Sequence, residues 1–299
     1  MCAGPGSPPT EDWREAIESQ HTRRIRRTFA VAAAPVTVRE FRQFLKESKL
    51  EAWFEAGGQA APLMKRCSPD EDGPIILVDW YKAAAYCNWL SQKDGLPEDQ
   101  WCYETNARKL SQEKLSGLVS LLAPQHALAT ATNASYFSFL LDRQPELTAL
   151  KKGYLGLRGY RLPTEAEMEY ACRAAAATSR YYGESEELLV NYGWYQKNSK
   201  ERAWPVGGKK PNDLGLFDMH GNVWNWCQES YNDYVVPQEG GAIEDKEYSL
   251  QIVSRNSRVL RGGSFVVHSS LVRSAYRYWY VPSNRLNNVG FRPARTFTP

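Results

Sequence analysis

The second half of this chain limits its possible folds most strongly. From Tyr181 to the end it is rich in glycine, asparagine and aromatic residues, and only short pieces such as residues 258–260 look like strands. The 299 residues include 10 Trp, 17 Tyr, 21 Gly and 17 Pro, and long runs with helical periodicity are few. Because each aromatic side chain buries a large area, such side chains can hold irregular segments together. We therefore expect a compact fold in which much of the chain is ordered loop.

Charge and cysteine patterns exclude several classes of function. The 37 basic and 34 acidic residues are interspersed and leave a net charge of only +3, so nucleic acid is not an expected partner. No apolar run is long enough to span a bilayer, so we expect no membrane span. The six cysteines include no C-x-x-C motif, which argues against a zinc site or redox dithiol. We expect mostly reduced, buried thiols in a cytoplasmic protein, although sequence separation alone does not exclude a disulfide.

The chain is expected to form one domain with two irregular parts. Residues 1–22 begin with a Pro- and Gly-rich stretch, which is typical of a flexible leader or linker. Residues 23–299 are expected to form a single domain, since irregular α+β folds of this size often have one core. Residues 106–152 mix helix formers with Ala, Thr and Ser and are predicted to be an insertion.

Three helices are predicted from the signals at their N-termini. Two Thr-x-x-Glu sequences, beginning at Thr37 and at Thr164, have the spacing of a capping box and precede apolar residues at helical spacing. The apolar residues 75–78 predict a strand, and Asp79 directly after them is the predicted N-cap of the third helix.

Four sequence blocks in the chain resemble one known family. They are RLPTEAE at residues 161–167, NDLGLFDMHGNVW at 212–224, RGGSF at 261–265 and GFR at 290–292. Their order and spacing over residues 33–295 resemble those of the formylglycine-generating-enzyme, or sulfatase-modifying-factor, superfamily. The resemblance implies an α+β fold of the C-type-lectin type, with a small twisted antiparallel sheet, few helices and long loops.

The resemblance also identifies what this chain lacks. Active members carry a copper-binding cysteine pair shortly after the Gly-Gly-Ser block, and the alignment places Val267 and Val272 there. Valine has no thiolate, so it can neither bind soft copper nor form a mixed disulfide, and no cysteine follows Cys227. We therefore expect no catalytic residue, no oxidase activity and no required cofactor.

Two other kinds of metal site are known in relatives with this fold. Some use clustered histidines for iron, whereas the four histidines here have no ligand-like spacing and are expected in the core or on the surface. Others bind calcium, which in this chain would use Asp218, Gly221, Val223 and Asn225. Asn225 stands where the family pattern has glutamate, which removes a negative charge. Calcium is thus a candidate ligand, and a hydrogen-bonded turn is the alternative.

The segment 259–295 carries a second resemblance, to the variable region of proteins diversified by retroelements. In those proteins, template asparagine codons are mutated at their adenines, while the codons between them stay fixed. An asparagine codon altered in this way keeps its final pyrimidine, which fits most of the mixed positions here; Trp279 does not fit, because its codon ends in a purine. The predicted variable, ligand-binding residues are Val266, Val267, His268, Leu271, Tyr276, Tyr278, Trp279, Tyr280 and Leu286.

The side-chain chemistry of this segment also favours binding. Four aromatic residues crowd residues 276–280 beside Pro282, without the periodicity of a buried strand. Tyrosine and tryptophan dominate binding surfaces because they offer large contact areas at low entropic cost. The alternative is that these rings fill the core. The recurring arginines are expected to hold the loops through hydrogen bonds to carbonyls and carboxylates; they are Arg261, Arg273, Arg277, Arg285 and Arg292.

Three functions remain open from the sequence. The first is a non-catalytic binding protein whose segment 259–295 takes a protein or peptide ligand. The second is an altered, metal-dependent enzyme of the superfamily. The third is a regulatory domain of a larger signalling protein.

Overall fold

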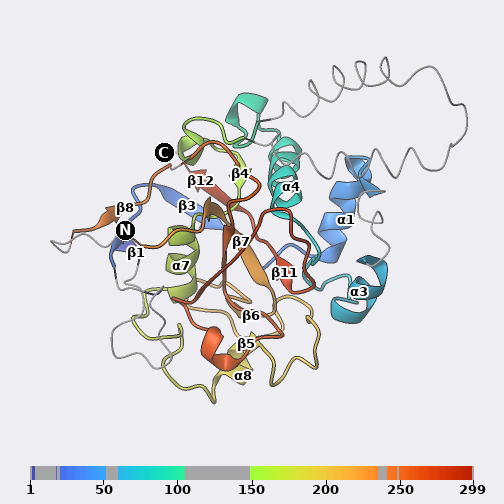
Figure 1. Ribbon diagram of the computed structural model, residues 1–299, viewed down its shortest axis with the longest axis vertical. Coiled ribbons are helices and arrows are strands. Elements are labelled where there is room, and N and C mark those ends of the chain that lie inside the picture. Colours follow the sequence, from blue (N-terminus) through green and yellow to red (C-terminus); the bar gives the residue numbers. More distant parts are fainter. Residues whose placement is uncertain are drawn as a thin grey trace, which may run out of the picture.

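The computed structural model describes residues 2–3, 18, 21–51, 60–104, 149–234, 241–247 and 249–297. They form an α+β fold in which short strands and a few helices are joined by long ordered segments, as expected (Figure 1). The helices are α1 (Val38–Glu47), α3 (Ala60–Cys67), α4 (Trp80–Lys93), α7 (Glu165–Arg173) and α8 (Leu189–Tyr192), with 3-10 turns η2 (Glu98–Gln100), η4 (Tyr154–Gly156) and η5 (Ser269–Leu271). The strands are β1 (Cys2–Ala3), β2 (Arg23–Arg24), β3 (Thr28–Val31), β4 (Tyr160–Arg161), β5 (Gly193–Trp194), β6 (His220–Gly221), β7 (Trp224–Ser230), β8 (Ile243–Glu244), β9 (Arg258–Arg261), β10 (Arg277–Tyr280), β11 (Val289–Gly290) and β12 (Ala294–Phe297).

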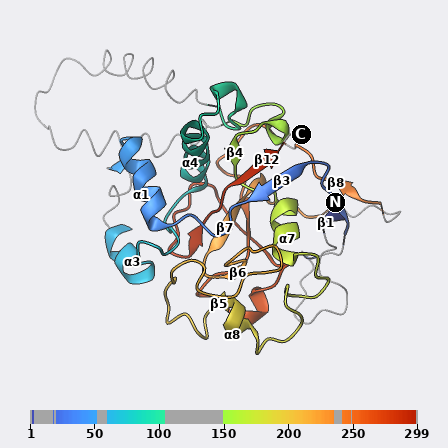
Figure 2. The ribbon, with the colours of Figure 1, turned by 180° about the vertical axis from the view of Figure 1, so that it is seen from behind.

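A four-stranded sheet with the order β10-β9-β7-β11 forms the centre of the molecule. β9 pairs antiparallel with both β7 and β10, whereas β11 pairs parallel with β7. β12 joins β3 and β4 in a second, antiparallel sheet. In Figures 1 and 2, α1, α3 and α4 lie on one flank of the central sheet and α7 lies on the other.

The helices begin where the capping signals predict. α1 follows Thr37 and α7 follows Thr164, and both capping boxes are present. α4 follows Asp79, whose carboxylate accepts a hydrogen bond of 2.7 Å from the backbone N–H of Lys82. These three predictions are confirmed because a side chain satisfies the first free N–H groups of each helix.

The predicted strand at residues 75–78 is wrong. All four side chains are buried, but the backbone of Leu77 has a φ of 58°, which breaks any strand. The N–H of Ile75 donates to the carbonyl of Val36, and that of Leu77 donates to the carbonyl of Leu286. An irregular segment that is buried on all sides has the same apolar composition as a buried strand, so the sequence does not separate the two.

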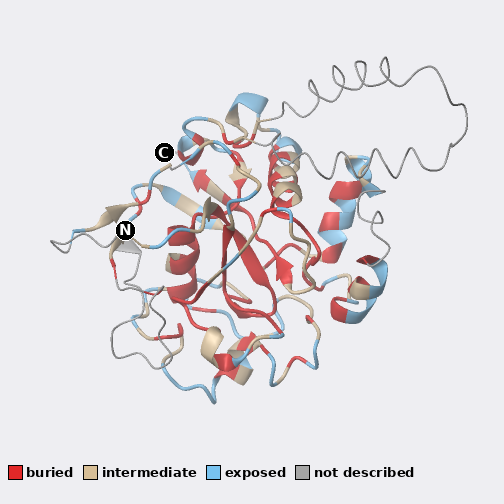
Figure 3. Ribbon diagram, viewed as in Figure 1, coloured by how far each residue is buried: buried red, intermediate tan, exposed pale blue. Residues whose placement is uncertain are grey.

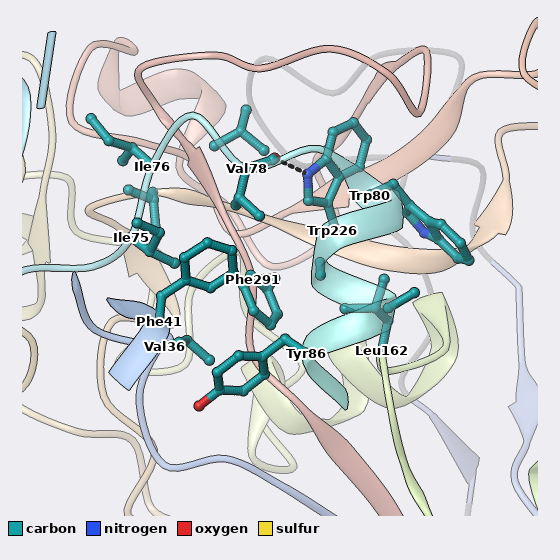
Figure 4. Close-up of a cluster of buried hydrophobic side chains, with 14 of the residues drawn as sticks. Val36, Phe41, Ile75, Ile76, Val78, Trp80, Tyr86, Leu162, Trp226 and Phe291 are labelled. Carbon is teal, nitrogen blue, oxygen red and sulfur yellow. Dashed lines mark hydrogen bonds between the residues drawn. The ribbon is translucent and has the colours of Figure 1, made fainter. Parts of the chain in front are cut away.

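The main core lies between α1, α4 and the central sheet (Figure 3). The ring of Phe41 stacks on Tyr86 at a centroid distance of 5.9 Å, and Phe291 meets Tyr86 edge-on at 5.2 Å (Figure 4). The indole N–H of Trp226 donates to the carbonyl of Val78 at 3.0 Å. Each such fully buried side chain contributes roughly 1.5–3 kcal/mol, so this cluster fixes the sheet that carries the candidate site.

The N-terminal residues that the structure describes pack onto the domain. β1 pairs with β2 and lies beside α7. The buried carboxylate of Glu18 accepts hydrogen bonds of 2.5 and 2.6 Å from the guanidinium of Arg273. Most of the expected leader, residues 1–22, lies outside the described residues, so its flexibility stays a prediction. Glu18 supplies the carboxylate partner that a buried arginine such as Arg273 needs. Of the predicted insertion, residues 106–152, the structure describes only residues 149–152.

Two further expectations concern cysteines and membranes. Cys67, Cys87, Cys102, Cys172 and Cys227 are buried free thiols, as expected. Within the described ranges, none of the helices has the length and apolar character needed to cross a bilayer.

Candidate ligand-binding surface

The candidate surface is built on β9 and β10, at the edge of the central sheet. Tyr278 lies opposite Leu260, and Trp279 lies opposite Val259. Contrary to the sequence expectation, β10 is a regular strand, and its side chains alternate between the two faces of the sheet. Tyr278 and Tyr280 therefore point to one face, while Arg277 and Trp279 point to the other.

Eight of the nine predicted binding residues are accessible. Val266 and Trp279 are each 40 % exposed, and His268 is also exposed. The half-buried members are Val267, Leu271, Tyr278, Tyr280 and Leu286. Tyr276 departs from the expectation: it is only 5 % exposed and belongs to the main core, where it fills space behind Trp224.

Of the two accessible tyrosines, Tyr278 stacks on a buried tryptophan and Tyr280 contacts Tyr278. The ring of Tyr278 stacks on Trp224 at 5.6 Å with an interplanar angle of 18° and meets Tyr280 edge-on at 5.2 Å. Burial raises the pKa of Tyr280 to about 12, so its hydroxyl stays neutral. Each ring therefore has one side held by the core, and its edge and hydroxyl remain available for a partner.

Five of the predicted residues border the same core. Val267, Leu271, Tyr278, Tyr280 and Leu286 all pack against the main cluster while keeping part of their surface accessible. Val266 and His268 are exposed on either side of Val267 in the chain. We call these seven residues the candidate face: Val266, Val267, His268, Leu271, Tyr278, Tyr280 and Leu286.

Trp279 does not belong to this face. Its indole lies on Tyr231 at a centroid distance of 4.3 Å, on the opposite side of β10. It is also the position whose codon does not fit the retroelement pattern. The position of Trp279 on the other side of β10 and its codon therefore both set it apart from the residues of the candidate face.

His268 forms the N-terminal cap of η5 and borders a small cavity. Its Nδ1 accepts a hydrogen bond of 3.3 Å from the backbone N–H of Ser270. The cavity has a volume of about 310 Å³, and Glu186 and Tyr195 also line it. Sequence reasoning missed these two residues, because they lie far from the variable segment in the chain and carry no motif.

Arg261 holds the loop that carries much of the candidate face. Its guanidinium is 2 % exposed and donates to the carbonyls of Ser274, Ala275 and Tyr276 at 3.2, 2.6 and 3.0 Å. It also forms an ion pair with Glu169. One buried cation therefore fixes three consecutive backbone groups.

The other predicted arginines act in the same way. Arg277 forms two hydrogen bonds with Glu165, at 2.5 and 2.9 Å, and Arg285 donates to the carbonyl of Leu77 at 3.0 Å. Burial alone would raise the pKa of Glu165, but the attraction of Arg277 and Arg261 lowers it to about 2. The predicted structural role of the arginines is confirmed, since their N–H groups donate hydrogen bonds to carbonyl and carboxylate oxygens.

The position of the catalytic cysteine pair is filled by aliphatic side chains. Val272 is fully buried and packs with Leu189 and Tyr195, and Val267 contacts the same cluster. These side chains offer neither a metal ligand nor a nucleophile.

The proposed calcium ligands do not fit a cation. The carboxylate of Asp218 accepts hydrogen bonds from the N–H of Gly207 at 2.8 Å and the amide of Asn222 at 3.2 Å. The amide nitrogen of Asn225 donates to the carbonyl of Val223, and the Nε of Arg292 donates to the Asn225 oxygen at 3.3 Å. A buried guanidinium thus already occupies this neighbourhood, and it would repel calcium. Gly221 bends the turn with a φ of 80°.

Histidine metal sites find no support in the described part of the chain. No group of three or more His, Cys, Asp or Glu there has the geometry to hold a metal ion. His220 is buried, and burial lowers its pKa to about 3, so it is a neutral core side chain. His126 lies outside the described residues.

Comparison with known proteins agrees with these motifs. The model of the sulfatase-modifying factor enzyme 1-like domain family matches residues 4–297. The chain belongs to this family. Its relatives include the formylglycine-generating enzyme of Streptomyces coelicolor, 33 % identical over 47 % of this chain and 48 % of that enzyme. They also include the inactive C-alpha-formylglycine-generating enzyme 2 of Mus musculus, 25 % identical over 89 % of this chain and 74 % of that protein.

A solved structure extends the similarity to almost the whole chain. Treponema denticola variable protein 1 superposes with a TM-score of 0.63 and 26 % sequence identity, covering 98 % of this chain and 93 % of that one. The match to the Streptomyces enzyme spans only about half of that enzyme's length. The family thus contains proteins named as enzymes and one named as inactive, and family membership alone does not assign an activity.

Proposed function

We propose that this chain is a non-catalytic binding protein whose candidate face takes a protein or peptide ligand. The proposal rests on one observation: the predicted variable positions are accessible at eight of nine sites, while the fixed residues between them are largely buried. Gly262 to Phe265 and residues 272–275 are all buried, for example. Side chains on such a surface can change without disturbing the core that carries them.

The chemistry of the face favours a protein or peptide over a small molecule. It offers two tyrosines, several aliphatic side chains and an imidazole beside a shallow hollow of about 310 Å³. Partly supported tyrosine rings lose little freedom on binding, which is why they dominate protein interfaces. Small-molecule sites are concave and enclose most of their ligand. A broad surface of mixed chemistry is therefore better suited to contact the surface of a protein or peptide.

The absence of catalysis is supported by the residues at the family's reactive position. Val267 and Val272 cannot transfer electrons from a thiol to oxygen, and Cys227, the last cysteine in the sequence, is a buried thiol on β7. Burial raises the pKa of Cys227 further above its ordinary value, so it is not a reactive thiolate.

Diversification by a retroelement explains the pattern of variable and fixed residues. The similarity to a protein named as variable supports this origin. The test is a comparison of the coding sequence for residues 259–295 with near-repeats in the source genome. We expect an adenine-rich repeat whose mismatches fall only at adenines and only in codons of the candidate face and Tyr276. A genome without such a repeat, or mismatches spread over all bases, would refute the diversification.

The altered-enzyme alternative has a separate test. The purified protein is analysed for copper and iron and is then supplied with each metal, a cysteine-containing peptide and oxygen. The proposal expects less than stoichiometric metal and no thiol oxidation above that of the free metal. One tightly bound metal ion per chain together with turnover would establish the enzyme instead.

A further inference from the structure

A larger cavity lies away from the candidate face. Its volume is about 590 Å³, within the range typical of small-molecule sites. The described residues that line it come from the end of β7, from α7 and from the segment around β8, together with Arg258 of β9, Arg277 of β10 and residues near β2 and η4. None of the nine predicted binding residues lines it, so it is a separate feature from the candidate face.

The wall of this cavity contains buried donors without hydrogen-bond partners. Arg258 is 2 % exposed, and only one of its nitrogens is engaged, donating to the carbonyl of Gln228 at 2.8 Å. Among the described residues, neither its Nε and Nη2 nor the amide nitrogen of Gln228 has a hydrogen-bond partner. The oxygen of that amide accepts from the hydroxyl of Tyr103 at 2.7 Å, which orients the nitrogen away from Tyr103. A buried donor without a partner costs roughly 1–3 kcal/mol, so three of them together indicate a missing acceptor.

The charge of Arg258 is also uncompensated. Among the described residues, no carboxylate hydrogen-bonds to its Nε or Nη2, and Glu229 attracts it without such a contact. The guanidinium lies over the ring of Trp80 at 4.9 Å. Two carboxylates of the same cavity are already engaged, since Glu165 pairs with Arg277 and Asp245 pairs with Arg27. In the part of the wall that the structure describes, Arg258 is therefore a cation without a direct ion-pair partner.

Three further acidic residues line the cavity. Glu169 pairs with Arg173 and Arg261, Asp233 is exposed, and Glu229 is a buried carboxyl near Arg258. Burial, followed by repulsion from Asp245 and Glu165, raises the pKa of Glu229 to about 8. A larger share of this carboxyl is therefore protonated near neutral pH than of an ordinary glutamate, which weakens both its attraction to Arg258 and its repulsion of an incoming anion.

The rest of the lining has enough apolar surface to contact the hydrocarbon part of a small organic ligand. Leu150, Tyr154, Ala166 and Ile243 contribute aliphatic and aromatic surface to the same cavity. Pockets for small ligands combine such surface with a few convergent polar groups. Here those groups are the unpaired donors of Arg258 and Gln228.

We propose that this cavity is a second binding site, for a small organic carboxylate that pairs with Arg258 and Gln228 and rests its apolar part against Leu150, Tyr154 and Ile243. The site is independent of the candidate face and of any protein ligand there. A ligand that binds only the folded state would also stabilise it in proportion to its concentration.

Matched probes test the chemistry of the ligand. Octanoate, phenylpropanoate and naphthylacetate are each titrated into the full chain beside the corresponding alcohol and amine, with binding followed by ligand-observed NMR and calorimetry. We expect at least one carboxylate to bind, and to bind at least about tenfold more tightly than its alcohol and amine. Equal binding of all three forms, or no binding by any carboxylate, would overturn the proposal.

Matched variants test the location of the site. Arg258→Gln removes the unpaired charge and should weaken carboxylate binding at least about tenfold, whereas Arg255→Gln removes the same charge from an exposed position three residues earlier and should change nothing. The fold is expected to tolerate Arg258→Gln, because no carboxylate loses its partner. Asn256→Trp, at an exposed rim position, provides a second test and should also block binding. Unchanged affinity in a folded Arg258→Gln or Asn256→Trp variant would refute the site.

Discussion

Replacing Arg261 with methionine should strongly destabilise the fold, although the residue lies close to a surface that tolerates change. Methionine keeps the aliphatic stem but removes every donor of the guanidinium. The carbonyls of Ser274, Ala275 and Tyr276 then lose a common partner, and the buried carboxylate of Glu169 loses one of its two arginines.

The magnitude follows from these contacts. Breaking a buried ion pair by removing one partner costs about 3–5 kcal/mol, because the other charge stays buried. Three unpaired carbonyls add to this, partly offset by water that enters the loosened loop. We expect a loss of at least about 4 kcal/mol, against a total stability of about 5–15 kcal/mol for a typical domain.

Val266→Ser is the matched comparison, since Val266 lies in the same loop but is 40 % exposed. Surface substitutions usually change stability by less than about 0.5 kcal/mol. Urea denaturation followed by tryptophan fluorescence gives both values. A loss below about 1 kcal/mol for Arg261→Met, or similar losses for both variants, would refute the division between fixed scaffold and variable face.

Three further predictions concern charge and backbone geometry. Because the pKa of Glu165 is lowered to about 2 from 4.5, the stability it contributes is present above pH 4.5 and is lost as the pH falls towards 2; the loss should be about 3 kcal/mol in urea denaturation across this range, and Glu165→Gln should flatten it. The raised pKa of Glu229 has the opposite sign, so stability should fall as the pH rises from about 5 through 8, and denaturation of Glu229→Gln should show no such fall; an identical alkaline slope in the variant would contradict the assignment. Gly221→Ala would place a Cβ 2.2 Å from the carbonyl oxygen of Trp194, at a φ of 80°, and should cost at least about 3 kcal/mol by chemical denaturation; a cost under about 1 kcal/mol would show that the turn can relax.

Local signals in the sequence predict three helices, α1, α4 and α7, and the role of the arginines, whereas α3 and α8 were not predicted. The capping residues Thr37, Asp79 and Thr164 act on backbone groups within three positions, so their effect does not depend on distant parts of the chain. The arginines were predictable for a different reason. A buried guanidinium has many donors to satisfy, and in a fold rich in loops the nearest acceptors are carbonyls and carboxylates.

Features that depend on packing between distant segments were not predictable. Residues 75–78 are apolar because all sides of them are buried, and this composition does not reveal that φ of Leu77 is positive. Tyr276 and Tyr278 have the same side chain and both rings lie near Trp224, yet Tyr276 is buried and Tyr278 is half-buried. The large cavity combines residues from β7, α7 and β8, which no local motif connects.

A library diversified at the seven positions of the candidate face tests the central claim most directly. The full chain is displayed on phage and selected against several unrelated proteins, beside a control library diversified at the buried residues 272–275. The account predicts that most members of the first library fold and that different targets select different, target-specific binders, while the control library yields mainly unfolded chains. A first library that unfolds as often as the control, or that yields no target-specific binder, would contradict it.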